Sequence, residues 1–344
     1  MQPILDLSII IVNWNSADFV CRCVRSIRQH TQGLTYEIIV IDNASFDGCD
    51  QMLRESDPKV RYIQSHENLG FAKANNLAFE SSRGTSLLFL NPDTEIMETA
   101  IVNLYGALSQ LPAAGVVGAG LLNADGSLQT SCLQSFPTII NQILCFEGLR
   151  RIWPESKLWG MAPLFKTGTH IMPDEVQGIS GACMLIRREV FEQIGRFSEN
   201  YFMYTEDLDL CYKALQSGWR NYYISGAKII HFGGGSSKQA SSDFSYIMMR
   251  ESIWRFLCKT RGDFYGLGYR TAMLLSAIIR LGLLLVVFPV LTFRGRRQRW
   301  NVSFREWRAV LRWSLRLAMP KPTKCGIVST PKQSQYQEAG PALK

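Results

Sequence analysis

Acidic, amide and imidazole side chains follow several apolar runs of the sequence, at the points where these runs stop. One such run, residues 86–90, is followed by Asn91, Pro92 and Asp93. Pro92 cannot donate a sheet hydrogen bond, so a strand formed by this run must end there. A carboxylate at that point could bind a hard divalent cation, and the cation could hold a diphosphate. The alternative is a turn in which Asp93 caps the next helix.

The same pattern recurs at three other apolar runs. Asn13 follows Val12, Asp42 and Asn43 end the second run, and His231 ends a run that precedes three glycines. The carboxyl ends of parallel strands meet at one edge of a sheet, so we expect these side chains to line one pocket. Asp42 could bind a pyrimidine ring or could form an Asx turn. A lone histidine is often structural, but beside Asp93 we interpret His231 as a metal ligand.

A cluster of acids follows an aromatic run at residues 201–204. Glu206, Asp207 and Asp209 would start a helix, where acids also stabilise the helix dipole. The neighbouring apolar residues would partly desolvate Glu206 and Asp207, and desolvation raises a carboxylate pKa into a range that suits a general base. We therefore interpret Asp207 as the base, with Glu206 beside it.

A helix predicted over residues 69–82 begins with a glycine and carries Lys73 near its start. Backbone N–H groups at a helix N-terminus attract anions, so this end is a candidate phosphate site. Asn68, just before it, is also simply a good N-cap residue. The sequence contains no Gly-x-Gly-x-x-Gly and no P-loop motif, which disfavours a Rossmann dinucleotide site and a P-loop nucleotidase.

Strands must alternate with helices to position these residues. Apolar runs predict strands over residues 7–12, 37–41, 60–64, 87–90, 115–122, 181–186 and part of 219–230. Amphipathic runs predict helices over residues 17–30, 49–56, 100–110, 188–194 and 205–216. This alternation is typical of an α/β fold with a mostly parallel sheet flanked by helices. Residues 123–176 lose the pattern, and we expect an irregular excursion that contributes to substrate specificity.

The composition limits the other possibilities. The first residues do not resemble a signal peptide, and the nine cysteines show no Cys-x-x-Cys pair, so we expect reduced thiols and no disulfide framework or zinc site. The net charge of +8 comes from the C-terminal third: residues 250–320 hold 14 Lys and Arg against three Asp and Glu, whereas residues 1–249 hold 19 against 25. That balance suits an anionic membrane surface or nucleic acid.

Apolar residues among these arginines favour the membrane. Residues 272–293 are almost entirely apolar, but only 13 residues separate Arg280 from Arg294, too few for the ~20 that span a bilayer. We therefore favour a shallow or re-entrant hairpin over a clean span. Residues 300–319 predict an amphipathic helix with Arg305, Arg308 and Arg312 on one face, typical of an interfacial helix on anionic lipid. The alternative is that its apolar side packs on the enzyme core.

Six ordered motifs resemble those of family 2 glycosyltransferases with a GT-A fold, closest to the bacterial rhamnosyltransferase-like branch. The motifs occupy residues 8–15, 41–48, 68–72, 90–93, 181–183 and 202–211. The resemblance covers roughly residues 6–240 and implies transfer of a sugar from a nucleotide donor with inversion at the anomeric carbon. Two departures from the family pattern are Asn91, in place of the first aspartate of Asp-x-Asp, and Ser198, in place of an aspartate.

The resemblance also implies roles for individual residues. Asp93 and His231 would hold Mg²⁺ or Mn²⁺ on the donor diphosphate, and Asp207 with Glu206 would act on the acceptor hydroxyl. Asp42 would bind the base, and the nucleotide-sugar site would comprise Val12, Asn13, Asp42, Asn43, Asn68, Lys73, Asn91 and Gly181. With so few ligands, we expect the diphosphate to complete the metal's coordination.

These expectations define an organisation and a set of partners. We predict a catalytic domain over residues 1–245, a basic helical membrane-association region over 246–320, and a disordered tail over 321–344. The enzyme would act at the cytoplasmic face of a bacterial inner membrane, as a peripheral or monotopic protein. It would use a UDP- or dTDP-sugar, rhamnose among the candidates, and a glycan or polyprenyl-linked acceptor, without nucleic acid. The rival interpretation is a non-catalytic nucleotide-sugar-binding or scaffold protein.

Overall fold

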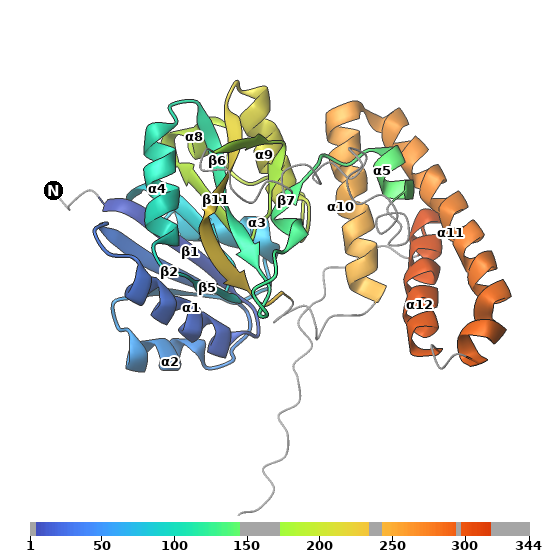
Figure 1. Cartoon of the computed structure of the whole chain (residues 1–344), viewed down its shortest axis with the longest axis horizontal. Coiled ribbons are helices and arrows are strands. Elements are labelled where there is room, and N and C mark those ends of the chain that lie inside the picture. The colour runs from blue at the N-terminus through green and yellow to red at the C-terminus, as the bar shows by residue number, and fades with distance from the viewer. Residues whose placement is uncertain (1–4, 145–172, 234–242, 294–296, 318–344) are drawn as a thin grey trace, which may run out of the picture.

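A mostly parallel sheet forms the centre of the N-terminal part of the protein (Figure 1). The computed structural model describes residues 5–144, 173–233, 243–293 and 297–317. The strands hydrogen-bond in the order β3-β2-β1-β4-β10-β6-β11-β5, and β8 also pairs with β11. Their bounds are β1 Leu5–Asn13, β2 Tyr36–Asn43, β3 Arg61–Ser65, β4 Gly84–Leu90, β5 Thr94–Ile96, β6 Ala114–Leu122, β8 Asp174–Val176, β10 Cys183–Arg187 and β11 Arg220–His231.

The apolar runs form the core of this sheet, as predicted. Ile9, Ile10 and Ile11 of β1 are fully buried, which requires helices over both faces of the sheet. The helices of this part are α1 Ala17–His30, α2 Cys49–Ser56, α3 Gly70–Phe79, α4 Ala100–Gln110, α8 Arg188–Gln193 and α9 Glu206–Gln216. The predicted alternation of strands and helices is thus confirmed, with differences of a few residues at their ends.

The direction of the strands determines which ends share an edge. β1, β2 and β4 are parallel, and β11 runs parallel to β6. β10 is antiparallel to both β4 and β6, so β6 and β11 have the same direction as β4. The carboxyl ends of β1, β2, β4 and β11 therefore meet at one edge, as the sequence predicts. The short strand β5 was not predicted; it pairs antiparallel with β11 and places Thr94 opposite His231.

The excursion after β6 begins with three short elements. They are the 3-10 helix η1 Thr130–Cys132, the strand β7 Leu133–Gln134 and the helix α5 Ile139–Leu144. β7 pairs with β9, Gly178–Ile179, in a separate two-stranded sheet. The predicted excursion over residues 123–176 lies partly outside the described residues, which omit 145–172.

Three helices follow the sheet and pack together (Figure 1). They are α10 Asp243–Arg261, α11 Asp263–Phe293 and α12 Arg297–Ser314, called the C-terminal bundle below. The bundle core contains Phe256, Tyr269 and Trp313. It also includes Leu208 of α9 and Tyr201 of the loop before α9. The bundle is thus packed directly on the part of the chain that carries the predicted base. The predicted disordered tail, 321–344, lies outside the described residues.

Two predictions about the bundle are wrong. Residues 272–293 contain no hairpin turn, because α11 runs unbroken from Asp263 to Phe293. Two groups outside α11 accommodate the charge of Arg280 within this helix. The Arg280 guanidinium lies over the Trp307 ring at 4.2 Å and donates a hydrogen bond to the Ile143 carbonyl at 2.7 Å. The apolar side of α12 is not presented to lipid. Trp307, Val310 and Trp313 are buried in the bundle, which is the packing alternative.

Candidate active site

Asp93 and His231 lie together at the carboxyl edge of the sheet. The pairing of β5 with β11 brings His231 Nε2 to 3.4 Å from Asp93 Oδ1, and Asn91 Nδ2 lies 3.5 Å from the same nitrogen. Both Asp93 and His231 are largely shielded from solvent, with side-chain exposures of 6% and 15%. The two residues predicted to hold a metal therefore lie side by side, with Asn91 next to them.

Gln129 orients the histidine ring. Its side-chain Nε2 donates to the backbone carbonyl of His231 at 2.7 Å, which leaves its Oε1 to accept from His231 Nδ1 at 2.9 Å. In the neutral imidazole, the proton is then on Nδ1, and the lone pair of Nε2 is directed toward Asp93. A nitrogen lone pair facing a carboxylate oxygen is a suitable pair of ligands for a divalent cation.

The donor set supplied by the protein is small. Among the described residues, no group of three or more His, Cys, Asp and Glu side chains could hold a metal ion. Asp93 and His231 would therefore provide two ligands, and the remaining positions would fall to a bound diphosphate or to water. This agrees with the small coordination set expected from the sequence.

The ends of β1 and β2 form a second polar group. Asn13 is paired with Asp42 across the two strands, and Asn13 Nδ2 donates to Asp42 Oδ2 at 3.2 Å and to Asp47 Oδ1 at 3.1 Å. Asp42 Oδ2 also accepts from the Tyr62 hydroxyl at 3.0 Å. Asp42 Oδ1 accepts from the Ser45 amide at 2.6 Å, which is the turn that the alternative interpretation predicted. Asp42 is thus held rigidly, and it is fully buried.

The start of α3 lies beside these residues. Asn43 Nδ2 donates to Asn68 Oδ1 at 2.8 Å, and Asn68 Oδ1 accepts from the Gly70 amide at 3.0 Å. Gly70 has φ of +75°, and a Cβ at this position would lie 2.2 Å from the Phe202 carbonyl oxygen. Only glycine therefore fits here, and the Phe71 amide donates to that carbonyl at 3.0 Å. Lys73 lies exposed on the same helix, and Val12 is buried in β1.

Asp207 is fixed by three donors. Its Oδ2 accepts from the Gly181 amide at 2.8 Å and from Gln134 Nε2 at 2.9 Å, and its Oδ1 accepts from the Leu208 amide at 2.8 Å. Burial raises the pKa of Asp207, while these three hydrogen bonds act against the rise. A carboxylate with a raised pKa that is oriented by fixed donors has the properties of a general base. Gly181, predicted to bind the nucleotide sugar, is in contact with Asp207 through this hydrogen bond.

Glu206 is more strongly perturbed than its neighbour. Burial and the adjacent Asp207 raise the pKa of Glu206 to about 8. Its Oε2 is buried and has no hydrogen-bond partner among the described residues. The two residues before it, Tyr204 and Thr205, both have positive φ, 71° and 70°, a conformation that costs energy for side chains larger than glycine. The surrounding structure must hold this turn in place.

Hydrogen bonds from backbone amides connect the strand end that carries Asp93 with the Asp207 carboxylate. The Asn91 amide donates to the Ala182 carbonyl at 3.0 Å, and Ala182 follows Gly181, whose amide donates to Asp207. The predicted metal pair and the predicted base are therefore attached to the same turn before β10. Because β10 is antiparallel, this turn lies at the carboxyl edge of its neighbours.

Three further residues, Gln129, Gln134 and Asp47, hold this site and were not among the predicted site residues. Gln129 and Gln134 lie in the irregular excursion, where no periodic pattern marks them. Asp47 lies within a motif that the sequence analysis noted, and its Oδ2 accepts from the Ala17 amide at 3.0 Å at the start of α1. Of the three, only Asp47 had a sequence signal, namely its position four residues after Asn43.

Comparisons with known proteins now identify the family. The model of glycosyl transferase family 2 matches residues 8–195, and that of glycosyltransferase-like family 2 matches residues 161–249. The chain belongs to glycosyltransferase family 2. The family members similar to it include the N-acetylglucosaminyl-diphospho-decaprenol L-rhamnosyltransferase of Mycobacterium tuberculosis, 30% identical over 65% of this chain and 75% of that protein. The rhamnosyltransferase WbbL of Escherichia coli is 24% identical over 74% and 93%.

A solved structure confirms the fold of this glycosyltransferase. The mannosyltransferase PcManGT of Pyrobaculum calidifontis, solved with GDP-Man and Mn²⁺, has a TM-score of 0.52 with 15% identity over 91% of this chain and 88% of that one. The predicted GT-A fold is thus confirmed, and the protein is a family 2 glycosyltransferase that is similar to rhamnosyltransferases. The identity is too low for this structure to assign individual residues.

Proposed function

We propose that this glycosyltransferase transfers a sugar from a UDP- or dTDP-sugar to a hydroxyl of a lipid-linked acceptor, by single displacement with inversion. The observation that carries the proposal is Asp207, a carboxylate of raised pKa held by Gly181, Leu208 and Gln134. A single displacement needs one base for the acceptor and a stabilised leaving group. The name of the similar mycobacterial enzyme supports L-rhamnose as the sugar and a polyprenyl-diphosphate acceptor.

In this proposal, different residues act on the acceptor, the nucleotide and the diphosphate. Asp207 takes the proton of the acceptor hydroxyl, and Glu206 remains protonated below pH 8, which limits negative charge next to it. Asp42 and Asn13 hold the base side of the donor, and the first turn of α3 with Lys73 faces the phosphates. Asp93 and His231 would hold Mg²⁺ or Mn²⁺, which when bound would neutralise charge on the departing diphosphate.

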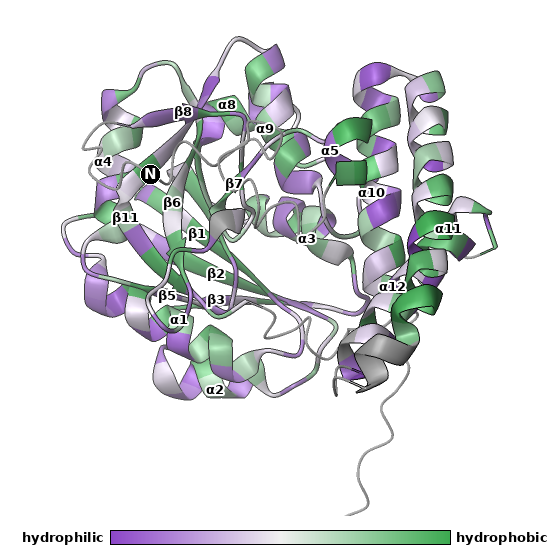
Figure 2. Ribbon diagram, turned by 45° about the vertical axis from the view of Figure 1, so that its right-hand side comes forward, coloured by the Kyte–Doolittle hydropathy of each residue, from purple (hydrophilic) through white to green (hydrophobic). Residues whose placement is uncertain are grey.

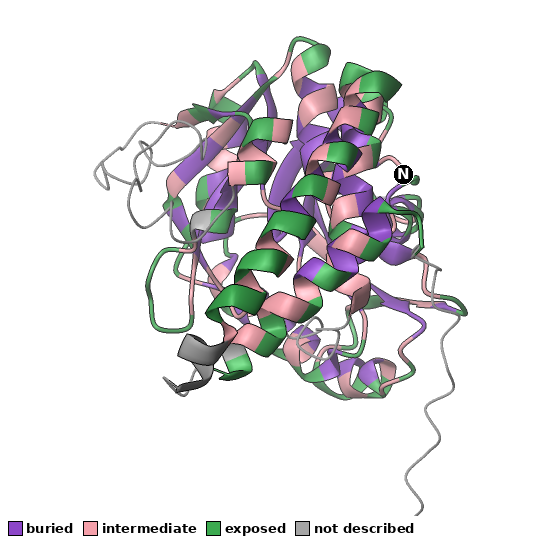
Figure 3. Ribbon diagram, turned by 90° about the vertical axis from the view of Figure 1, so that its right-hand side faces the viewer, coloured by how far each residue is buried: buried purple, intermediate pink, exposed green. Residues whose placement is uncertain are grey.

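We further propose that α11 contacts the membrane. Among the described helices, it alone is long and apolar enough to cross a bilayer by length and composition. A stretch of 18 residues within Asp263–Phe288 has a mean hydropathy of 2.3, and 17% of that stretch is buried. Figure 2 shows hydrophobic residues along α11, and Figure 3 shows the exposed residues along its outer side. The exposed apolar side chains of α11 include Leu275, Ile278, Ile279, Leu283, Leu285 and Val286.

The arginines of α12 complement this apolar surface. Arg305, Arg308 and Arg312 of α12 are exposed, as is Arg316 just beyond its end, whereas Trp307, Val310 and Trp313 are buried. Acyl chains on α11 and anionic headgroups on α12 would place the enzyme at the cytoplasmic face of a bacterial inner membrane. An acceptor with a polyprenyl anchor would reach the excursion from that surface, because α5 contacts α11 through the Arg280 hydrogen bond to Ile143.

A transfer assay tests the function. The full-length enzyme is incubated with Mn²⁺ or Mg²⁺, dTDP-L-rhamnose or a UDP-sugar, and N-acetylglucosaminyl-diphospho-polyprenol in anionic vesicles. We expect a new glycolipid whose anomeric configuration, determined by NMR, is inverted relative to the donor. If no nucleotide sugar that stabilises the enzyme thermally is transferred to this acceptor, or if the configuration is retained, the proposal is wrong.

A further inference from the structure

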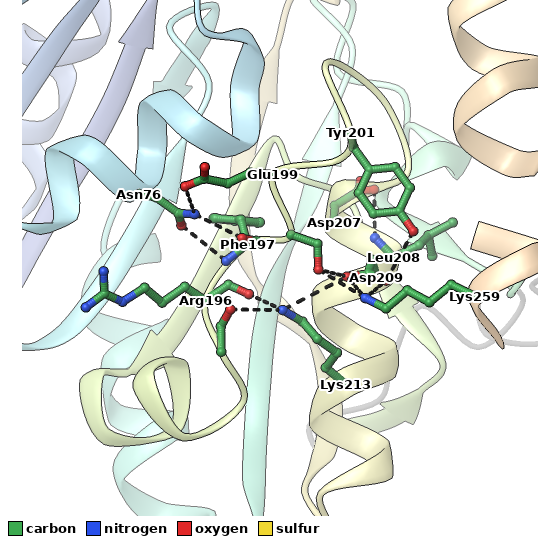
Figure 4. A network of polar contacts seen from close by, with 12 residues as sticks. Asn76, Arg196, Phe197, Glu199, Tyr201, Asp207, Leu208, Asp209, Lys213 and Lys259 are labelled. Atoms are coloured by element: carbon green, nitrogen blue, oxygen red, sulfur yellow. Dashed lines mark hydrogen bonds and ion pairs between the residues drawn. The ribbon is translucent and has the colours of Figure 1, made fainter. Parts of the chain in front are cut away.

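The turn that carries the base is held from outside the catalytic sheet. The loop of residues 197–205 leads into α9, and its end has the unfavourable positive φ of Tyr204 and Thr205. On one side of the loop, Asn76 of α3 donates to the Phe197 carbonyl at 2.9 Å and to Glu199 Oε1 at 3.0 Å (Figure 4). The other side of the loop faces α10 of the C-terminal bundle.

One stripe of α10 contacts this loop at three points. Ser252 Oγ donates to the Met203 carbonyl at 2.8 Å, and Arg255 Nη1 donates to the Asn200 carbonyl at 3.1 Å. Lys259 Nζ donates to Ser198 Oγ at 3.0 Å. The spacing of three and four residues places these side chains on the same face of the helix. The stripe therefore follows the loop toward α9.

Lys259 also enters the first turn of α9. Its Nζ lies 2.7 Å from Oδ1 and 2.8 Å from Oδ2 of Asp209, whose side chain is fully buried (Figure 4). The Tyr201 hydroxyl and Ser198 Oγ donate to the same carboxylate, at 3.2 Å and 2.5 Å. A buried carboxylate needs a counter-ion, so Asp209 binds Lys259 strongly.

Asp209 is close to the base along the helix. It lies two residues after Asp207, and its amide donates to the Thr205 carbonyl at 2.8 Å, which closes the first turn of α9 over the strained residues. Fixing the Asp209 side chain therefore fixes the turn that presents Asp207. Lys213, four residues on, has its Nζ 4.0 Å from Asp209 and donates instead to loop carbonyls, so it cannot replace this link to α10.

We propose that Lys259 is a positioning residue for glycosyl transfer, acting through Asp209 to hold Asp207 in its catalytic position. The inference rests on the proposed role of Asp207 as the base. Lys259 lies ten residues beyond the last residue that the family models match, 249, so the C-terminal bundle completes the active site as well as contacting the membrane. A base displaced by about 1 Å loses roughly 10²-fold in rate.

Amide hydrogen exchange and steady-state kinetics test the inference. Lys259→Met is compared with Lys259→Arg, and with Arg261→Met as a control that removes a neighbouring exposed charge from the same helix. In Lys259→Met we expect the amides of residues 203–209 to exchange at least about 10-fold faster and kcat to fall about 10²-fold at unchanged donor KM. Lys259→Arg should restore kcat to within a few-fold, and Arg261→Met should behave as the wild type.

A second variant separates positioning from simple stabilisation, because Lys259→Met leaves a buried charge. Lys259→Met/Asp209→Asn removes both charges, so its Tm should return toward the wild type while exchange stays fast and kcat low. Recovery of kcat together with Tm, or wild-type exchange at residues 203–209 in Lys259→Met, would overturn the inference. If the wild type transfers no sugar, the proposed function fails, whereas the exchange experiment still decides whether Lys259 holds the turn.

Discussion

The main-chain amide of Gly181 donates a 2.8 Å hydrogen bond to Asp207 Oδ2. Gly181 begins the turn before β10, and the next residue of that turn accepts from the Asn91 amide. The carboxylate that we propose as the base is thereby attached to the strand end that carries the proposed metal ligand Asp93.

Removing the side-chain donor to Asp207 should move the acidic limb of the pH–rate profile. Transfer needs ionised Asp207, so activity is lost as pH falls through its pKa. Gln134 stabilises the ionised form, and Gln134→Ala therefore raises that pKa further. We expect the acidic midpoint of kcat to move up by about one pH unit. Gln193→Ala, at an exposed position of α8, serves as the control, and an unmoved midpoint in Gln134→Ala would argue against Asp207 as the titrating group.

The sequence predicts those residues of the candidate site that lie at the ends of parallel strands. Asn13, Asp42 and Asp93 follow apolar runs, and parallel strands necessarily bring such ends to one edge. The contact between Asp93 and His231 depends on β5, a strand of three residues that pairs with β11. So short a strand has too few residues to show a periodic pattern, and the pairing spans more than 130 positions of sequence.

The sequence predicted less where partners come from distant parts of the chain. Trp307 and Trp313 form an apolar stripe that fits lipid or protein equally well, and only the presence of α10 and α11 decides for protein. In the sequence alone, Arg280 argues against a clean membrane span and favours a re-entrant hairpin. Its charge is instead accommodated by the Trp307 ring and the Ile143 carbonyl, neither of which lies near it in sequence.

Loss of the residue that orients His231 should weaken metal binding. Gln129→Ala removes the acceptor for Nδ1, so the ring is free to change tautomer and orientation. We expect the Kd for Mn²⁺, measured by electron paramagnetic resonance with UDP or dTDP present, to rise about 10- to 100-fold. Asp93→Asn should abolish the same binding. Wild-type affinity in Asp93→Asn would contradict the assignment of the metal pair, and Asn103→Ala on α4 controls for loss of an amide elsewhere.

Glu206 should make the folded protein less stable at alkaline pH. Its pKa is raised to about 8 from an ordinary value of 4.5, so between these values the native state binds more protons than the unfolded state. The free energy of unfolding therefore falls as pH rises through this interval, by about 1.4 kcal/mol for each pH unit at most. Glu206→Gln should remove this fall. Thermal unfolding from pH 5 to pH 9 measures it, and parallel curves for the two proteins would contradict the assignment.

Charges on the outer face of α11 should release the enzyme from membranes. Ile279→Glu/Val286→Glu places two carboxylates on exposed positions, so the fold should tolerate them. We expect binding to anionic vesicles, measured by co-sedimentation, to fall at least about 10-fold, since each carboxylate would be moved out of water. The matched control is Leu77→Glu/Leu128→Glu, two exposed positions outside the bundle. Equal loss in both variants would exclude a specific role for α11.

The central claim is that Asp207 is the base for transfer, and one pair of measurements on Asp207→Asn tests it. The amide keeps the size of the side chain and removes its ability to take a proton. We predict that kcat for transfer to the lipid-linked acceptor falls by about 10² to 10⁴, while the affinity for the nucleotide sugar, measured by calorimetry, stays within a few-fold of the wild type. Transfer at the wild-type rate by Asp207→Asn would contradict the account.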